Sequence, residues 1–355
     1  CYAGKTLSAL KLQYKDFSSW QNHLFKSSDN ILEIILTRPE QDEGILNYVH
    51  LFKEKTLFGI LREIYFEWLP PIHFSYISYH FSKRNLQYSY KLKINPNKIK
   101  SNKLRLEEDI ISPTGNTIYK RFQYIKNQES EKIYNRERSL STPIYWAPDH
   151  PRFYKLILKV KLLNRTIIKI DKNIGIREFD DKMGSLILNN KPLKIKGIIY
   201  REPYHLVTST NNNQDFYRYI YQDFHNIKEM GFNAIRFPHT VPHPYCAHLA
   251  DSLGLLLFIE NGIWRLPKEL YQSNKFLQSI KSISEEIAQE YYLNPSFMAL
   301  GLAHEIPLDD PATSKFILII REYLRQKYKI LSYVSPLDNN RLPQNNISNF
   351  YLINK

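Results

Sequence analysis

The sequence predicts a multidomain protein in which β-sandwiches precede a partial α/β barrel. The 355 residues exceed the usual size of one domain, and a hydrophobic fraction of 43% is sufficient for buried cores. Up to about residue 180, short alternating segments are separated by turn residues, which is typical of antiparallel sandwiches. Beyond that point strands alternate with helices, which is typical of a parallel sheet. We therefore expect domains at residues 1–71, 72–180 and 181–355.

The first half is predicted to be β-structure. Residues 86–94 alternate in polarity, so Tyr88, Tyr90 and Leu92 are expected on one face of a strand. Pro70 and Pro71 interrupt the pattern and mark the first domain boundary. A hairpin is expected at residues 2–5, and strands over residues 30–36, 59–67, 73–80, 86–94, 116–124 and 154–162.

The second half is predicted to form βα units. Phe216, Ile220 and Phe224 recur at helical spacing, and Gly231 follows as a C-terminal cap. A hairpin running into a first strand is expected over residues 186–197. Helices are expected over residues 216–230, 244–253, 275–292 and 314–328, and strands over residues 232–237, 255–259, 297–302, 330–334 and 349–353. These segments amount to about six strands of a right-handed barrel by Lys355.

The chain is basic, with 49 Lys and Arg against 35 Asp and Glu and a net charge of +14. Such an excess can mark an anionic partner. The basic residues are spread over the whole length instead of gathering in one tail or helix, which favours a compositional bias over a dedicated anion-binding face. We therefore expect no nucleic-acid partner. Polyanion binding stays as an alternative that would require the charge to gather on one face.

The two cysteines, Cys1 and Cys246, cannot form a disulfide framework, and no Cys/His cluster has zinc spacing. We therefore expect no metal site, and Cys246 is predicted to be a core residue. Cys1 has two interpretations. It is either the lipidated first residue of a mature periplasmic or surface lipoprotein, or the start of a fragment, and the predicted strand around it favours the fragment. No apolar run reaches the ~18 residues of a transmembrane helix.

Eight short segments carry a resemblance to a known family. They are residues 59–62 (GILR), 145–154 (YWAPDHPRFY), 175–178 (GIRE), 188–193 (LNNKPL), 230–236 (MGFNAIR, followed by Pro238 and His239), 250–255 (ADSLGL), 294–297 (NPSF) and 301–305 (GLAHE). In this order they resemble motifs of glycoside hydrolase family 2, which includes β-galactosidases, β-glucuronidases and β-mannosidases. The resemblance implies a partial, jelly-roll-like, sugar-binding sandwich, an immunoglobulin-like sandwich and a partial (β/α)8 TIM barrel.

The resemblance also implies a catalytic residue. Retaining glycosidases use one carboxyl group as acid/base and a second as nucleophile. Glu305, at the end of the fourth barrel strand, corresponds to the acid/base, and we expect nonpolar surroundings to raise its pKa. The nucleophile belongs at the end of the seventh strand. Since about six strands precede Lys355, we assign no nucleophile and expect no hydrolysis by this chain.

Five further residues are predicted to contact the substrate. Arg236, His239 and Glu260 follow or end barrel strands, and Trp264 can stack on a sugar ring. His304 stands where the family has an Asn that bonds the sugar 2-hydroxyl, so this contact changes. Residues 199–203 (IYREP) also depart from the family's N-x-H pattern at the first strand.

We therefore interpret the chain as a glycoside hydrolase homologue whose parent reaction is retaining hydrolysis of a terminal β-linked sugar. The expected partner is a carbohydrate, and no cofactor is expected. The alternative is a catalytically inactive carbohydrate-binding or scaffold protein of the same fold. The identity of the sugar and the oligomeric state stay open.

Overall fold

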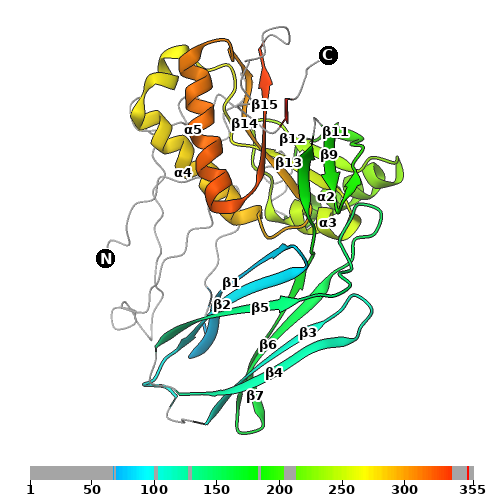
Figure 1. Ribbon diagram of the computed structural model, residues 1–355, viewed down its shortest axis with the longest axis vertical. Coiled ribbons are helices and arrows are strands. Elements are labelled where there is room, and N and C mark those ends of the chain that lie inside the picture. Colours follow the sequence, from blue (N-terminus) through cyan, green and yellow to red (C-terminus); the bar gives the residue numbers. More distant parts are fainter. Residues whose placement is uncertain are drawn as a thin grey trace.

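The computed structural model describes residues 67, 69–99, 103–126, 130–182, 185–203, 213–337 and 350–351. Antiparallel strands form the lower body in Figure 1, and a parallel sheet with helices forms the upper body. The hairpin expected at residues 2–5, the strand at 30–36 and all but the last residue of the strand at 59–67 fall outside the described ranges. The fold expected for residues 1–71 thus stays a prediction.

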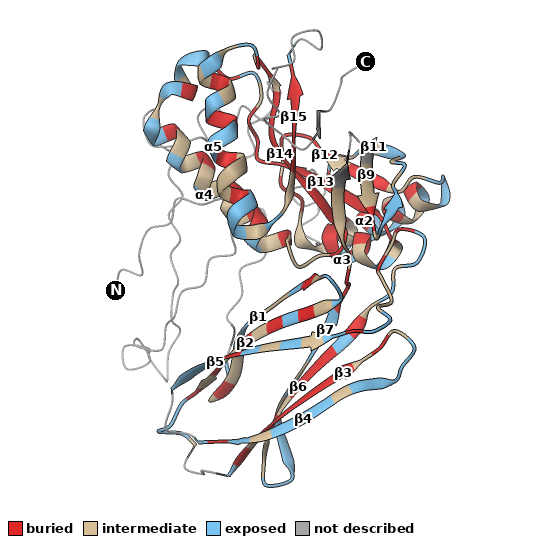
Figure 2. Ribbon diagram, in the orientation of Figure 1, coloured by how far each residue is buried: buried red, intermediate tan, exposed pale blue. Residues whose placement is uncertain are grey.

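Two antiparallel sheets enclose one core in the lower body. One sheet has the order β1 (Ile72–Ser82), β2 (Asn85–Ile94), β5 (Glu131–Ser139), and the other the order β4 (Thr117–Ile125), β3 (Leu104–Ile111), β6 (Tyr154–Leu162), β7 (Arg165–Ile174). Along β2, Leu86, Tyr88, Tyr90 and Leu92 are buried and the residues between them are not, as Figure 2 shows for the strand. The alternation predicted over residues 86–94 is confirmed.

Three of these strands were not predicted, because charged residues interrupt their apolar patterns. β3 carries Glu107, Glu108 and Asp109 in its middle, yet all three are buried. Each of these acidic residues forms an ion pair with a basic residue of another strand, β6 in the same sheet or β5 in the facing sheet. Arg136 lies 2.8 Å from Glu108, Lys161 lies 3.0 Å from Glu107, and Lys159 lies 3.0 Å from Asp109. Ion pairs to β6 in the same sheet and to β5 in the facing sheet therefore take the place of apolar alternation in β3.

The upper body is built on a six-stranded parallel sheet whose strands follow one another in chain order. They are β11 (Gly197–Ile199), β12 (Ala234–Phe237), β13 (Leu256–Glu260), β14 (Phe297–Ile306), β15 (Leu331–Pro336) and β16 (Phe350–Tyr351). The helices between them are α2 (Asn213–Glu229), α3 (Pro244–Leu253), α4 (Asn274–Tyr291) and α5 (Pro311–Tyr328), with the short 3-10 helix η3 (Lys268–Gln272) before α4. The predicted alternation of strands and helices is confirmed. In the described part of the chain, no helix combines the length and apolar character required to cross a membrane.

The two faces of the parallel sheet have separate cores. The helices pack on one face through residues such as Ile220, Phe224 and Ile320, together with buried Cys246. The other face packs against Trp146, which the lower body supplies, through Leu256, Phe258 and Tyr333. A small antiparallel sheet of β8 (Phe179–Lys182), β9 (Ser185–Leu188) and β10 (Lys191–Pro192) leads into β11.

Several segments that carry the family resemblance form the contact between the two bodies. Trp146 Nε1 donates to Asp251 O at 2.8 Å, and Arg177 Nη2 donates to Phe297 O at 2.6 Å. Asn189 links two of the segments by donating to Trp146 O at 2.9 Å and accepting from Glu178 N at 2.9 Å. These motifs therefore fix how the antiparallel body meets the parallel sheet.

Gly254 shows how close this contact is. It ends α3 with φ of +70°, a left-handed conformation that suits glycine. A Cβ atom at this position would lie 2.1 Å from Pro148 O. The motif glycine is therefore required both by the helix end and by the neighbouring backbone.

Candidate active site

The candidate residues gather where the parallel strands end. Arg236 lies in β12, Glu260 is the last residue of β13, and Glu305 is the penultimate residue of β14. Because neighbouring strands of this sheet are parallel, their carboxyl ends lie along one edge. His239 and Trp264 follow β12 and β13 directly, so the sequence alone brings them to the same edge.

Glu260 is the buried centre of the site, with 2% of its surface exposed. Its Oε1 accepts a 2.8 Å hydrogen bond from Arg236 Nε and a 3.0 Å bond from Tyr333 OH. Its Oε2 accepts a 2.8 Å bond from the backbone nitrogen of His239. A buried carboxylate needs such compensation, and here a guanidinium supplies most of it. The carboxylate orientation is consequently fixed by β12, by the segment that follows it and by β15.

Gly301 creates the space for this cluster. A Cβ atom on Gly301 would lie 2.6 Å from Glu260 Cγ and 2.7 Å from Tyr333 Cζ. Any larger residue at position 301 would therefore displace the side chains of Glu260 and Tyr333. Close packing against Glu260 and Tyr333 thus explains why the GLAHE segment begins with glycine.

The end of β14 is irregular. Its pairing with β15 shifts register between Gly301 and Ala303 and again between His304 and Ile306. Glu305 has φ of +51°, a left-handed conformation that is uncommon for a non-glycine residue. In a regular strand, neighbours point to opposite faces, and bulges change this direction. The irregularity lets His304 and Glu305, although adjacent in sequence, both contact the residues that follow β12 and β13.

The loop after β13 runs beside β14. His304 N donates to Ile263 O at 2.8 Å, and Arg265 N donates to His304 O at 3.3 Å. These bonds place Trp264 and Arg265 at the Glu305 carboxylate. Trp264 Nε1 lies 2.8 Å and Arg265 Nε 2.5 Å from Glu305 Oε2. Glu305 is thus held by a hydrogen bond and an ion pair from one loop.

These contacts set the ionisation of Glu305. Burial acts to raise its pKa, but the Trp264 hydrogen bond acts against it, and the electrostatic influence of the neighbouring His304 acts in the same direction as that bond. The Arg265 guanidinium adds to this opposition, and the pKa of Glu305 lies below its ordinary value. The sequence-based expectation of a raised pKa is therefore wrong, because the Trp264 hydrogen bond, His304 and Arg265 together outweigh the effect of burial.

His239 contacts Glu260 and the aromatic rings beside Glu305. Its ring centroid is 4.7 Å from that of His304 and 5.0 Å from that of Trp264. Burial, partly offset by the charge of Glu260, lowers the pKa of His239 to about 4. The imidazole is consequently neutral at pH 7, so one ring nitrogen can donate a hydrogen bond and the other can accept one.

All six candidate residues therefore lie in one connected group. Contacts link Arg236 to Glu260, Glu260 to His239, His239 to His304 and Trp264, and Trp264 to Glu305. Sequence reasoning missed Arg265 and Tyr333, which bind Glu305 and Glu260. Tyr333 lies in a strand that the sequence did predict, so its position near a strand end was the available signal.

Glu202 was also missed. It lies in the segment after β11 that departs from the family pattern, and it is buried with 8% of its surface exposed. Its Oε1 accepts a 2.7 Å hydrogen bond from His243 N and a 3.4 Å bond from Cys246 Sγ. This carboxylate therefore ties the end of the first strand to the start of α3.

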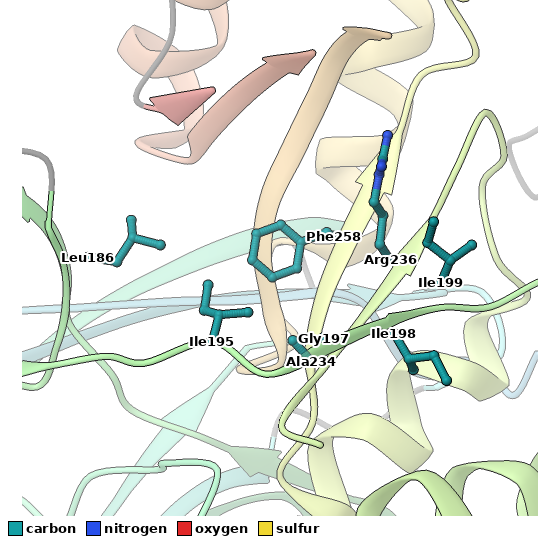
Figure 3. Close-up of a pocket in the computed structure, with 8 residues that line it drawn as sticks. All are labelled: Leu186, Ile195, Gly197, Ile198, Ile199, Ala234, Arg236 and Phe258. Carbon is teal, nitrogen blue, oxygen red and sulfur yellow. The ribbon is translucent and has the colours of Figure 1, made fainter. Parts of the chain in front are cut away.

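A cavity of about 410 Å³ lies beside the candidate residues on the β11 side. Figure 3 shows the apolar side chains that line it, with the Arg236 guanidinium reaching away from Leu186 and Ile195. Sugar sites require several polar groups to bind hydroxyls. Arg236 is the one candidate residue that lines the cavity, and its other lining residues are apolar, so the cavity does not join the candidate residues into one pocket.

Three comparisons place these features among known proteins. The family model described as glycosyl hydrolases family 2 matches residues 72–177. A curated relative from Formosa agariphila, provisionally named a β-glucuronidase, is 26% identical over 254 residues, which are 70% of this chain and 29% of the relative. These matches confirm the resemblance that the sequence motifs indicated.

Solved structures show the same fold. A β-glucuronidase of Parabacteroides merdae matches with a TM-score of 0.59 and 18% identity, covering 75% of this chain and 34% of that one. β-Glucuronidase 3 of Bacteroides uniformis matches with a TM-score of 0.60 and 18% identity, covering 78% of this chain and 35% of that one. The chain thus spans about a third of the length of these relatives.

Proposed function

We propose, for a chain related to glycoside hydrolase family 2, that its parent reaction is the retaining hydrolysis of a terminal β-glycosidic bond. In this proposal the antiparallel body is an immunoglobulin-like sandwich over residues 72–180. Residues 181–355 are part of a (β/α)8 barrel, and residues 1–71 are part of a sugar-binding sandwich. The family match over residues 72–177 and the strand order of the parallel sheet support this assignment.

The position of Glu305 carries the proposal. In α/β barrels the chemistry takes place at the carboxyl ends of the strands, and Glu305 lies at the end of the fourth parallel strand, β14. Its side chain is 21% exposed, so solvent and substrate can reach it. We propose that Glu305 protonates the leaving oxygen and that Arg265 moves away from it when a sugar binds. The departure of this cation raises the pKa of Glu305 toward the value that an acid catalyst needs.

The neighbouring residues have distinct proposed roles. Trp264 and His239 present ring surfaces to the sugar, and His304 donates to its hydroxyls. Arg236 holds Glu260, and Glu260 in turn holds the backbone of His239, so these two residues position the contact residues. Because similar structures include β-glucuronidases and a protein of Bacteroides fragilis described as a β-galactosidase, β-glucuronides and β-galactosides are the first substrates to test.

One observation favours the alternative, a carbohydrate-binding protein without activity. Glu305 is held as a carboxylate by Trp264 and Arg265, and a carboxylate cannot donate a proton. We also assign no nucleophile. In the alternative the protein binds the sugar but does not hydrolyse it. Both candidate functions therefore predict sugar binding, and only the hydrolase predicts turnover.

Calorimetric titration with phenyl 1-thio-β-glycosides tests the shared part, because the thio linkage resists hydrolysis. We expect one of the glucuronide, galactoside, mannoside or glucoside forms to bind, and Trp264→Ala to weaken it about tenfold or more, since an aromatic contact contributes ~0.5–1.5 kcal/mol beyond its area. Leu318→Ala, an exposed change on α5, is the matched control. If none of the four compounds binds, the proposal is wrong.

Chromophore release from the matching nitrophenyl glycosides then separates the two candidates. Release that falls by ~10²–10⁴-fold in Glu305→Gln supports the hydrolase, because this is the usual contribution of an acid/base. Binding without release supports the inactive protein. Release that survives Glu305→Gln contradicts the role proposed for Glu305.

A further inference from the structure

Three buried side chains at the strand ends form a compact set of metal-ligand types. His239, Glu260 and His304 each offer one ligand atom, and these atoms lie within 4.8 Å of one another. Over the described ranges, no other group of three or more His, Cys, Asp and Glu residues is this compact. The three residues come from consecutive strand ends, after β12, at the end of β13 and in β14.

The Glu260 carboxylate is oriented for such a role. Its Oε1 is occupied by Arg236 and Tyr333, whereas its Oε2 lies 3.5 Å from His239 Nδ1. A carboxylate oxygen has two lone pairs, and the backbone nitrogen of His239 uses one on Oε2. Arg236 and Tyr333 thus serve as the outer partners that fix a ligating carboxylate.

The two imidazoles are held by their backbones. His239 has φ of +58° and its backbone nitrogen bonds Glu260. His304 lies in the irregular end of β14, and its backbone nitrogen bonds Ile263 O. Their rings are 4.7 Å apart at 47° to each other, so neither ring stacks flat on the other. Ring rotation about fixed backbones can therefore turn a nitrogen of each toward Glu260 Oε2.

We propose that His239, Glu260 and His304 form a binding site for a divalent transition-metal ion such as Zn²⁺. Two imidazoles and one carboxylate are a common ligand set of zinc sites that keep an open fourth position. Zinc–ligand distances of ~2.0–2.2 Å require ligand atoms ~3.3 Å apart, so atoms now up to 4.8 Å apart must approach one another by up to about 1.5 Å. The nitrogen ligands select against Mg²⁺ and Ca²⁺, which prefer oxygen.

The charges around the site are compatible with a dication. Arg236 is paired with Glu260 on the oxygen that the metal does not use, and the second carboxylate, Glu305, follows His304 directly. Because His239 and His304 are also proposed sugar contacts, a bound ion and a bound sugar would exclude each other. This last consequence rests on the proposed function, whereas metal binding does not.

Calorimetry on the chelator-treated full chain tests the site with ZnCl₂ and MgCl₂ as titrants and no sugar present. We expect one Zn²⁺ per chain and no heat from Mg²⁺. His304→Asn should weaken Zn²⁺ binding about 100-fold or more, since losing even an outer partner costs about 10–100-fold. His248→Asn, a histidine exposed on α3, is the control and should leave the affinity unchanged.

A second readout guards against unfolding of a variant. Co²⁺ replaces Zn²⁺ in such sites and absorbs visible light when its ligands are tetrahedral. Wild-type protein with Co²⁺ should therefore show a visible absorption band that His304→Asn lacks. The melting temperatures of the two metal-free proteins should be the same, which shows that the variant is folded. No Zn²⁺ binding, or binding that His304→Asn leaves unchanged, would overturn the proposal. Loss in His248→Asn alone would place the ion on the surface and likewise overturn it.

Discussion

The indole nitrogen of Trp264 donates a 2.8 Å hydrogen bond to Glu305 Oε2, joining the loop after β13 to the end of β14. The same oxygen is paired with Arg265 Nε at 2.5 Å. Two consecutive residues of one loop therefore control one carboxylate. Since the Arg265 side chain is 57% exposed and the Trp264 ring is partly covered, Arg265 is the partner that can leave at low cost.

The first prediction concerns this ion pair. Arg265→Ala removes a cation that lowers the pKa of Glu305, so the titration of Glu305 should move to higher pH. Nuclear magnetic resonance of ¹³C-labelled glutamate carboxyls measures the titration midpoint of Glu305. The signal of Glu305 is the one that disappears in Glu305→Gln. Arg325→Ala, which removes an exposed cation paired with Glu322 on α5, is the control and should leave that signal unchanged. An unchanged midpoint in Arg265→Ala would show that the ion pair does not persist in solution.

The second prediction concerns the buried pair. Glu260→Gln leaves the Arg236 guanidinium buried without its counter-charge, and breaking a buried pair typically costs about 3–5 kcal/mol. Urea unfolding at pH 7 should show this loss. Glu322→Gln, which removes an exposed partner of Arg325, should cost about 0–1 kcal/mol. Equal losses in the two variants would contradict the buried position of Glu260.

The third prediction separates backbone strain from a steric clash. Gly231 and Gly254 have φ of +84° and +70°, so alanine strains the backbone at either position. This strain costs about 1–2 kcal/mol. An added Cβ at Gly231 meets no atom within 4 Å, whereas at Gly254 it meets Pro148 O at 2.1 Å. We expect Gly254→Ala to cost about 1–3 kcal/mol more than Gly231→Ala in urea unfolding. Similar losses would argue against the close contact of the two bodies at Pro148.

The fourth prediction is a pH dependence at the α4–α5 contact. Glu285 on α4 accepts hydrogen bonds from Lys327, Tyr323 and Tyr328 on α5. Burial acts to raise the pKa of Glu285, but these bonds outweigh it and lower the pKa from 4.5 to about 2. A carboxyl with a lowered folded-state pKa contributes stability that is complete above its unfolded pKa and is lost as pH falls through the folded value.

The stability difference between wild type and Glu285→Gln should therefore be larger at pH 6 than at pH 3. A shift of this size corresponds to at most about 2 kcal/mol over that interval. Chemical unfolding at the two pH values measures the difference. A difference that is constant or that grows toward acid pH would show that Glu285 is not held by α5.

The sequence predicted the parallel half more completely than the antiparallel half. Apolar spacing in the helices and the short apolar strands, such as residues 255–259, needs no knowledge of distant partners. β3 was missed because its buried acidic residues, Glu108 and its neighbours, are compensated by Arg136, Lys159 and Lys161 from other strands. Ion pairs between strands depend on the tertiary structure, so they leave no periodic pattern in the sequence.

The candidate site was likewise predicted only in part. Arg236, Glu260 and Glu305 were predicted because strand ends can be located from the pattern, and strand ends converge. The pKa of Glu305 was predicted with the wrong sign because Trp264 and Arg265 reach its carboxylate only through the loop that runs beside β14. The grouping of His239 with His304 depends on the left-handed and bulged backbone at the strand ends, which the sequence does not reveal.

The central claim is that the glycosidic atom of a bound sugar lies at Glu305. A crystal structure of the chain with the phenyl 1-thio-β-glycoside that binds best tests it directly. We predict the glycosidic sulfur beside Glu305, with a carboxylate oxygen at roughly hydrogen-bond distance and Arg265 displaced from it. The sugar ring should contact Trp264 and His239. A sugar bound elsewhere, or a glycosidic sulfur out of reach of Glu305 with the Arg265 ion pair intact, would contradict the account.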